Sequence, residues 1–110
     1  MMIEESSYTC LHRSVIRTFL KMERGGINSL PIYLWLVGRW ESENGNLDQM
    51  AETPSRISVA EPSIEDFIAV TGRTEDTTRR YIKFLTDYDL VVSGPNSTLS
   101  IAVYMGGVDE

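Results

Sequence analysis

The sequence predicts an α+β fold, mostly α-helical, that ends in a β-hairpin. Apolar residues recur at three- and four-residue intervals over residues 13–24, 63–71 and 74–85, which is typical of helices that pack on one face. Two short runs rich in β-branched residues, 90–92 and 99–104, flank the turn sequence at 94–97 and indicate a hairpin. We expect one domain over residues 1–110, because 110 residues leave no room for two independent cores.

The first helix is expected to start at Arg13 and to stop at Gly25 and Gly26. Residues 8–11 before it read as a short strand or lead-in, with His12 on the same strand as Cys10. The apolar face of the helix comprises Val15, Ile16, Phe19, Leu20 and Met22, and a basic row comprises Arg13, Arg17, Lys21 and Arg24. This row is either a second basic face that contacts phosphate or the solvated side of an amphipathic helix.

The second helix is expected from Ser29, as N-cap, to about Ser42, with Pro31 in its first turn. It is apolar nearly all round, so it is either buried as the central helix or serves a second chain. Tyr33, Trp35 and Trp40 are accordingly interpreted as core residues, as dimer contacts, or as both. A long connection follows over residues 44–61, with a brief strand at 56–60; loops this long are usually functional or mobile.

Two short helices joined at Gly72 make up residues 63–85, a helix-turn-helix. Ser63 and Asp66 have the spacing of a capping box, and Thr74 caps the second helix. Four residues of the second helix are expected to face inward: Thr78, Tyr81, Ile82 and Leu85. The hairpin at about 90–104 then forms a wing, so the predicted architecture is a winged helix-turn-helix with a C-terminal β-hairpin.

Charge is unevenly distributed along the chain, whose net charge is −6. Basic residues gather in residues 13–24 and 73–83, the segment 41–66 is acidic, and nothing after Lys83 is basic. A local basic face on an acidic body predicts weak nonspecific affinity for DNA. The single cysteine, Cys10, excludes an intrachain disulfide and favours a reducing cytoplasm. The start MMIEESS is unlike a signal peptide, and the apolar run 30–37 is too short to span a membrane.

Catalysis is not expected. His12 and Cys10 are the only residues of their types, and nothing near them indicates an orienting third group. The chain has too few ligands of the types that zinc prefers, and it has neither a calcium-loop spacing nor a phosphate-cradling glycine motif. We therefore expect no catalytic residue, no metal site and no cofactor.

From about residue 8 to residue 104 the order of elements resembles winged helix-turn-helix DNA-binding domains. It is most similar to the N-terminal modules of plasmid and phage replication initiators and to small regulators carried on mobile elements. The segment YTCLHRSVIR precedes the buried-helix sequence PIYLWLVGRW, followed by the Pro-Ser helix opening and Thr-Gly. The recognition-helix pattern is matched residue by residue at Thr77, Arg79, Arg80, Tyr81 and Lys83. The resemblance implies that Arg79, Arg80 and Lys83 contact DNA.

The expected function is sequence-specific binding of duplex DNA by a dimer, on a palindromic site, in transcription repression or in replication or partition control on a plasmid, phage or similar element. The expected DNA-binding residues are Arg73, Thr74, Thr77, Arg79, Arg80, Lys83, Ser97 and Thr98. The hydroxyls of Ser97 and Thr98 either contact phosphate or serve the turn. Glu75 and Asp76 either accept a hydrogen bond from cytosine or cap the helix, where each also stands four residues before an arginine.

A second function is compatible with the same sequence. The acidic surface and the turn SGPNST, which lacks Lys and Arg, are features of a winged helix that binds protein. Such a module would be, for example, a viral or plasmid factor that binds a host protein or a replication complex.

Overall fold

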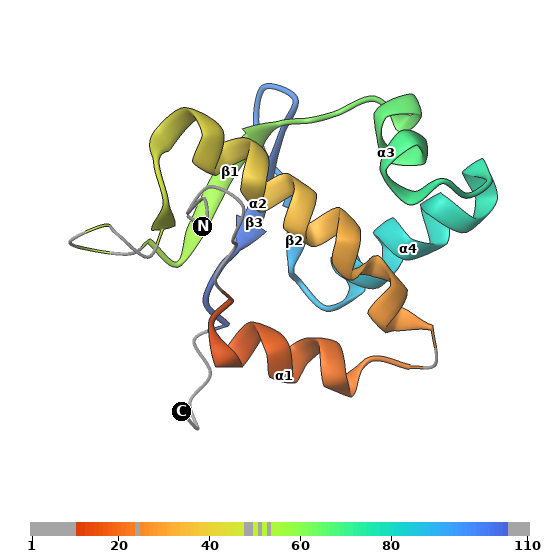
Figure 1. Ribbon diagram of the computed structural model, residues 1–110, viewed down its shortest axis with the longest axis horizontal. Helices are drawn as coiled ribbons and strands as arrows, with labels where there is room; N and C mark the ends of the chain where they lie inside the picture. The colour runs from red at the N-terminus through yellow and green to blue at the C-terminus, as the bar shows by residue number, and fades with distance from the viewer. Residues whose placement is uncertain (1–10, 24, 48–49, 51, 53, 106–110) are drawn as a thin grey trace, which may run out of the picture.

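The computed structural model describes residues 11–23, 25–47, 50, 52 and 54–105, and within them the chain is α+β and mostly helical, as predicted (Figure 1). The elements follow in the order α1 (Arg13–Lys21), the 3-10 helix η2 (Gly26–Ser29), α2 (Leu30–Asn44), β1 (Arg56–Ala60), α3 (Ile64–Thr71), α4 (Glu75–Asp87), β2 (Val91–Ser93) and β3 (Thr98–Ala102). No helix of the described residues is long and apolar enough to cross a membrane.

The three strands form one antiparallel sheet in the order β1-β3-β2. β1 pairs with β3 from Arg56 opposite Ala102 to Ala60 opposite Thr98, and β2 pairs with the same strand from Val91 opposite Ile101. The strand expected at 56–60 is therefore present, and it joins the sheet beside the hairpin. The side chains of β1 alternate between exposed and buried, so the sheet has one face toward the core.

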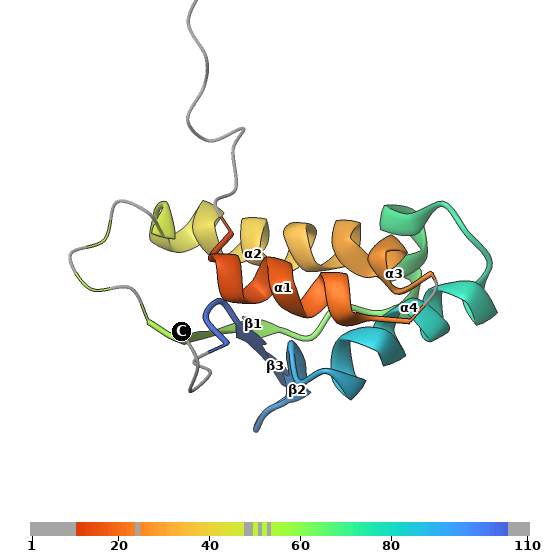
Figure 2. The ribbon, with the colours of Figure 1, turned by 90° about the horizontal axis from the view of Figure 1, so that it is seen from below.

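The core lies between the sheet and the helices, and α2 runs through its centre (Figure 2). Four residues from two successive turns of α2 are buried: Ile32, Tyr33, Leu36 and Val37. Val15 and Phe19 cover them from α1, and the Phe19 and Tyr33 rings meet edge to face at a centroid distance of 5.5 Å. The expectation that α2 is buried is thus confirmed for residues 32–37, whereas residues 38–44 are partly or fully exposed.

The first helix is shorter than the periodicity predicted. α1 ends at Lys21, because Met22 has an extended backbone (ψ 152°), and Arg24 lies outside the described residues. His12 is the N-cap of α1 and accepts a hydrogen bond from the Ser14 amide at 3.0 Å, so its placement on a strand was wrong. Cys10 and the rest of residues 8–10 lie outside the described part of the chain.

Ser29 is the N-cap residue of α2, as predicted, but its side chain makes no capping hydrogen bond. The Ser29 hydroxyl donates to the Gly26 carbonyl oxygen at 2.6 Å instead, because η2 leads directly into α2 and Ser29 already has a helical backbone. At the other end α2 continues to Asn44, two residues beyond the expected end at Ser42, and stops at Gly45 (φ 94°). Pro31 lies in the first turn, as predicted.

Two apolar side chains of α1 that were expected to face the core are exposed. Ile16 is 43% exposed and Leu20 is 74% exposed. Val15 and Phe19 occupy the side of the helix that faces α2, and Ile16 and Leu20 lie at the edge of that side. Among the described residues, the apolar stripe of α1 is therefore wider than the surface that covers it.

The hairpin is placed as predicted, with its strands displaced by one or two residues at their ends. β2 begins at Val91 rather than Leu90, and β3 covers Thr98–Ala102 rather than 99–104. Asn96 and Ser97 have positive φ angles of 57° and 58°, which lets the chain reverse within the turn at 94–97.

Candidate nucleic-acid interface

The short helix α3 is fixed at both ends by local sequence. Ser63 and Asp66 form the predicted capping box: the Ser63 hydroxyl accepts from the Asp66 amide at 3.2 Å, and the Asp66 carboxylate accepts from the Ser63 amide at 3.3 Å. The helix ends at Gly72, whose φ of 67° is left-handed, as predicted. Phe67 packs edge to face against Trp35 of α2 at a centroid distance of 5.6 Å. These contacts hold α3 against the central helix.

A pair of threonines joins α3 to α4 across the turn. The hydroxyls of Thr71 and Thr78 are 2.7 Å apart, and Thr78 is fully buried. The Thr71 hydroxyl also accepts from the Arg73 amide at 3.1 Å. The sequence pattern predicted that Thr78 faces inward but gave no partner for it. Thr71 and Thr78 stand seven residues apart, on either side of Gly72, and this spacing could have indicated the pair. This pair links the last residue of α3 to the buried side of α4.

The start of α4 is capped by Thr74, as predicted. The Thr74 hydroxyl accepts from the Thr77 amide at 3.2 Å, and the hydroxyls of Thr74 and Thr77 are 3.1 Å apart. Glu75 and Asp76 occupy the first turn, where the helix dipole stabilises carboxylates. Thr74 and Thr77 therefore cap α4 by local contacts, and Thr74, Glu75 and Asp76 remain exposed.

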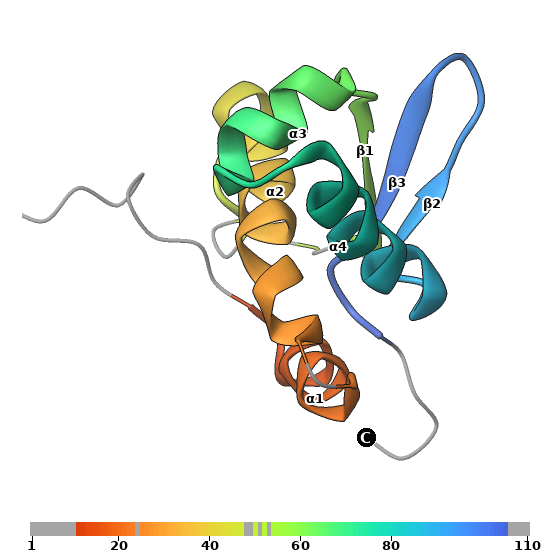
Figure 3. The same cartoon turned by 90° about the vertical axis from the view of Figure 1, so that its right-hand side faces the viewer.

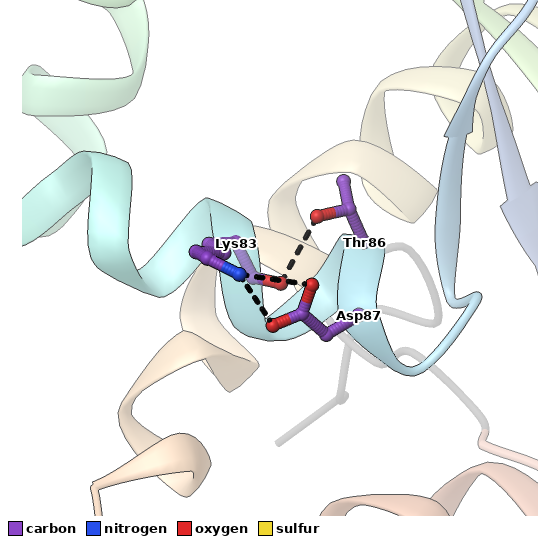
Figure 4. A network of polar contacts seen from close by, with 3 residues as sticks. All are labelled: Lys83, Thr86 and Asp87. Atoms are coloured by element: carbon purple, nitrogen blue, oxygen red, sulfur yellow. Dashed lines mark hydrogen bonds and ion pairs between the residues drawn. The ribbon is translucent and has the colours of Figure 1, made fainter.

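The outward face of α4 presents the three predicted cations, Arg79, Arg80 and Lys83, all of them exposed. Arg79 forms an ion pair with Glu75 at 2.8 Å, which their four-residue spacing permits and which is the alternative to a DNA contact. Lys83 forms an ion pair with Asp87 at 2.9 Å that the sequence analysis did not anticipate (Figure 4). Arg79, Glu75, Lys83 and Asp87 keep half or more of their side-chain surface in solvent, so both pairs are weak and readily exchanged.

Two further arginines at the same end of the molecule have no such partner. Within the described part of the chain, Arg73 and Arg80 form no side-chain hydrogen bond or ion pair, so the Asp76–Arg80 pair that the spacing permits is absent. Both side chains are exposed. Along α4 itself the three carboxylates, at residues 75, 76 and 87, equal the three cations in number. The cationic character of this surface therefore comes from the arrangement of individual side chains and from Arg73 in the preceding turn.

The hairpin stands beside α4, so the two elements border the same side of the molecule (Figure 3). The Thr98 hydroxyl donates to the Pro95 carbonyl oxygen at 2.6 Å, and thus closes the turn. The Ser97 carbonyl oxygen accepts from the Glu61 amide at 2.9 Å, which ties the hairpin to the segment before α3. Ser97 is exposed, and the turn at 94–97 carries no charged residue.

A cavity of about 200 Å³ lies between α4, α3 and the sheet. Its floor is apolar and includes Leu36, Phe67 and Ile82, whereas Arg79 and Ser93 belong to its polar lining. Arg79 therefore stands at the edge of the outward face of α4, where its exposed side chain borders the cavity. The same cavity is lined by Val91 and Ser93 of β2 and by Leu99 of β3.

The remaining residues singled out from the sequence lie elsewhere. Arg13, Arg17 and Lys21 are exposed along α1, whose last carbonyl oxygen, on Lys21, accepts from the Tyr88 hydroxyl at 3.4 Å. Of the three aromatic residues proposed as dimer contacts, Tyr33 is buried in the core. Its hydroxyl donates to the Ala102 carbonyl oxygen at 2.8 Å. Trp35 and Trp40 are partly exposed, and the Arg39 guanidinium lies 5.1 Å from the Trp35 ring centroid.

Among the described residues, no group of three or more histidine, cysteine, aspartate or glutamate side chains is placed to hold a metal ion. Comparisons with known proteins found no matching family model, no similar curated protein and no similar solved structure.

Proposed function

We propose that the chain is a winged helix-turn-helix protein that binds duplex DNA, with α4 as the recognition helix and the hairpin as the wing. The observation that carries the proposal is the exposed cationic set on and before α4: Arg73, Arg79, Arg80 and Lys83. An α-helix fits the major groove of B-DNA, where arginine can form two hydrogen bonds with guanine and can also contact phosphate. The process served would be transcription repression, or control of replication or partition on a mobile element.

The ion pairs on α4 are compatible with this role. An exposed pair four residues apart stabilises a helix by only about 0.2–0.5 kcal/mol, so a phosphate or a guanine can displace Glu75 from Arg79. Arg73 and Arg80, which have no partner among the described residues, need no such exchange. The rest of the chain is acidic, with a net charge of −6. Affinity for random DNA would therefore be low, and tight binding would require a specific sequence read by two protomers together.

The test is selection of bound duplexes from a random pool by the wild-type protein and by the Arg79→Ala/Arg80→Ala variant. We expect the wild type to enrich a two-fold symmetric sequence and the variant to enrich none. On the selected site, Arg80→Ala alone is expected to cost on the order of 1–3 kcal/mol of binding free energy. Replacement of two α1 cations, Arg13→Ala/Lys21→Ala, gives the same change in net charge and serves as the matched control. Absence of enrichment by the wild type at low salt would exclude the proposal.

Protein binding is the second candidate, and one observation favours it. Two of the three cations on α4 are already paired with carboxylates, and the turn of the wing has no cation to hold a phosphate. Retention on a heparin column at low salt separates the two candidates. A DNA-binding protein with an available cationic face is retained, whereas an acidic interaction module flows through.

A further inference from the structure

The exposed face of α1 combines two kinds of side chain. Ile16 and Leu20 stand one helical turn apart, and the Leu20 side chain, at 74%, is the most exposed large hydrophobic of the described residues. Arg13, Arg17 and Lys21 form the adjacent row at the same spacing, and no residue of α1 is acidic. We refer to these five residues as the α1 face. Single exposed hydrophobic residues are ordinary, but two neighbours on a nine-residue helix, beside a row of cations, are not.

We propose that the α1 face docks a partner protein through an amphipathic segment whose apolar side chains are bordered by carboxylates. Leu20 and Ile16 would be covered by the apolar row of that segment, which removes their surface from water. The carboxylates would lie opposite Arg13 and Lys21, which have no ion-pair partner in the described part of the chain. The inference is independent of DNA binding by α4, because none of its residues belongs to the proposed DNA interface.

A second copy of this chain is a poorer occupant of the same face. Two α1 faces related by a two-fold axis would bring both basic rows together without any acidic residue on either helix, and like charges in contact are unfavourable. A head-to-tail contact with an acidic surface of another copy would not close into a dimer and would build a ring or a filament. Charge complementarity therefore favours an acidic partner of different sequence.

Nucleic acid is also a poorer occupant. Phosphates would neutralise the basic row but would leave Leu20 and Ile16 without an apolar surface to cover them. An amphipathic protein segment can cover the two apolar side chains and pair with the basic row at the same time. The mixture of residues on the α1 face, and not its charge alone, identifies the class of partner.

The experiment is selection from a displayed library of 20-residue helical peptides of random sequence, with the immobilised full chain as bait. We expect the enriched peptides to carry apolar residues one turn apart with aspartate or glutamate beside them. A synthetic copy of the best peptide is expected to bind at least tenfold more weakly to Leu20→Ser and to Arg13→Glu/Lys21→Glu. The matched control is Val92→Ser, which removes another exposed hydrophobic side chain, 41% exposed, and is expected to leave binding unchanged.

Several outcomes would overturn the proposal. They are the absence of enriched peptides, enrichment of peptides without carboxylates, and binding that does not depend on Leu20. Concentration-dependent dimerisation that Leu20→Ser abolishes would assign the α1 face to a second copy. A loss of affinity for the selected DNA in Arg13→Glu/Lys21→Glu would assign it to nucleic acid. Because Leu20 and Arg13 are exposed, these variants are expected to fold, and their melting temperatures check that they do.

Discussion

Tyr33 is the buried polar residue on which the packing of α2 against the sheet depends. Its side chain is 1% exposed, and its hydroxyl donates to the Ala102 carbonyl oxygen at 2.8 Å across 69 positions of sequence. Burial raises the pKa of the Tyr33 phenol well above its usual value. One side chain therefore joins the central helix to the end of β3 both by packing and by a hydrogen bond.

The first prediction concerns Tyr33→Phe. At neutral pH the variant is expected to lose about 1–3 kcal/mol of unfolding free energy, because the Ala102 carbonyl keeps its place in the core without a donor. Above about pH 10, an exposed tyrosine of the unfolded chain loses its proton while folded Tyr33 keeps its own. The folded state then binds more protons than the unfolded state does. The contribution of Tyr33 to the free energy of unfolding therefore falls by about 1.4 kcal/mol for each further pH unit. Denaturant titrations from pH 8 to pH 11 check the result: the slope above pH 10 is expected to be shallower in the variant, and equal slopes would contradict it.

The second prediction compares two glycines. Gly72 has a left-handed backbone (φ 67°), and an added Cβ there would meet no atom within 4 Å. Gly72→Ala is therefore expected to destabilise the fold by about 1–2 kcal/mol through backbone strain alone. Gly38, inside α2, also has space for a Cβ and lacks the positive φ. Gly38→Ala is expected to stabilise the fold by about 0.5–1 kcal/mol, because alanine favours the helix. Thermal unfolding of both variants measures the difference, and the same sign for both would refute the strain argument.

At the scale of elements, the sequence predicts best where one local motif decides the structure. Ser63 with Asp66, Gly72 and Thr74 have fixed spacings and fixed hydrogen bonds, and the structure forms each of them. The strand at 56–60 was also predicted correctly, but from the resemblance to winged helices, whose sheet often has a strand before the second helix, and not from a local period. Element type follows from such motifs because their partners lie within a few residues.

What the sequence could not predict depends on neighbours that are distant in sequence or on competing local bonds. The exposure of Ile16 and Leu20 follows from how little of α1 is covered by α2, and the periodicity of α1 alone cannot show that. Ser29 fits the pattern of a cap, but the preceding 3-10 turn offers its hydroxyl a nearer acceptor in Gly26. On α4, Lys83 pairs with Asp87, whereas Asp76 and Arg80 do not pair. Both couples stand four residues apart, so the spacing alone cannot predict which of them forms.

The third prediction tests the ion pair on α4. Glu75→Gln is expected to raise affinity for the selected DNA about twofold or more, because it frees Arg79 and removes a negative charge near the phosphates. Glu43→Gln, near the end of α2, makes the same change in net charge and is the matched control. Titration of a labelled duplex measures both variants. A loss of affinity confined to the specific site would instead indicate that Glu75 reads a base, as a carboxylate can do at cytosine.

At the scale of the whole molecule, charge is divided between faces. The chain has a net charge of −6, yet four exposed cations, Arg73, Arg79, Arg80 and Lys83, lie on α4 and in the turn before it, and the α1 face holds three further cations. This division would let one small domain bind an anionic duplex at α4 and an acidic protein segment at α1, while its acidic remainder repels random DNA. The two proposed surfaces lie on different helices, so substitutions in one are expected to leave the other intact.

The fourth prediction uses salt to count the phosphate contacts of the intact protein. If the four cations around α4 each neutralise one phosphate, the logarithm of the binding constant falls with the logarithm of salt concentration with a slope of about −3.6 for each protomer. Arg79→Ala/Arg80→Ala is expected to reduce that slope by about 1.8 for each protomer, on any duplex that still binds. Lys21→Ala is expected to leave it unchanged, because Lys21 belongs to the α1 face. A slope near zero in the wild type would mean that the cations of α4 meet no phosphate, and protein binding would then be the better account of both helices.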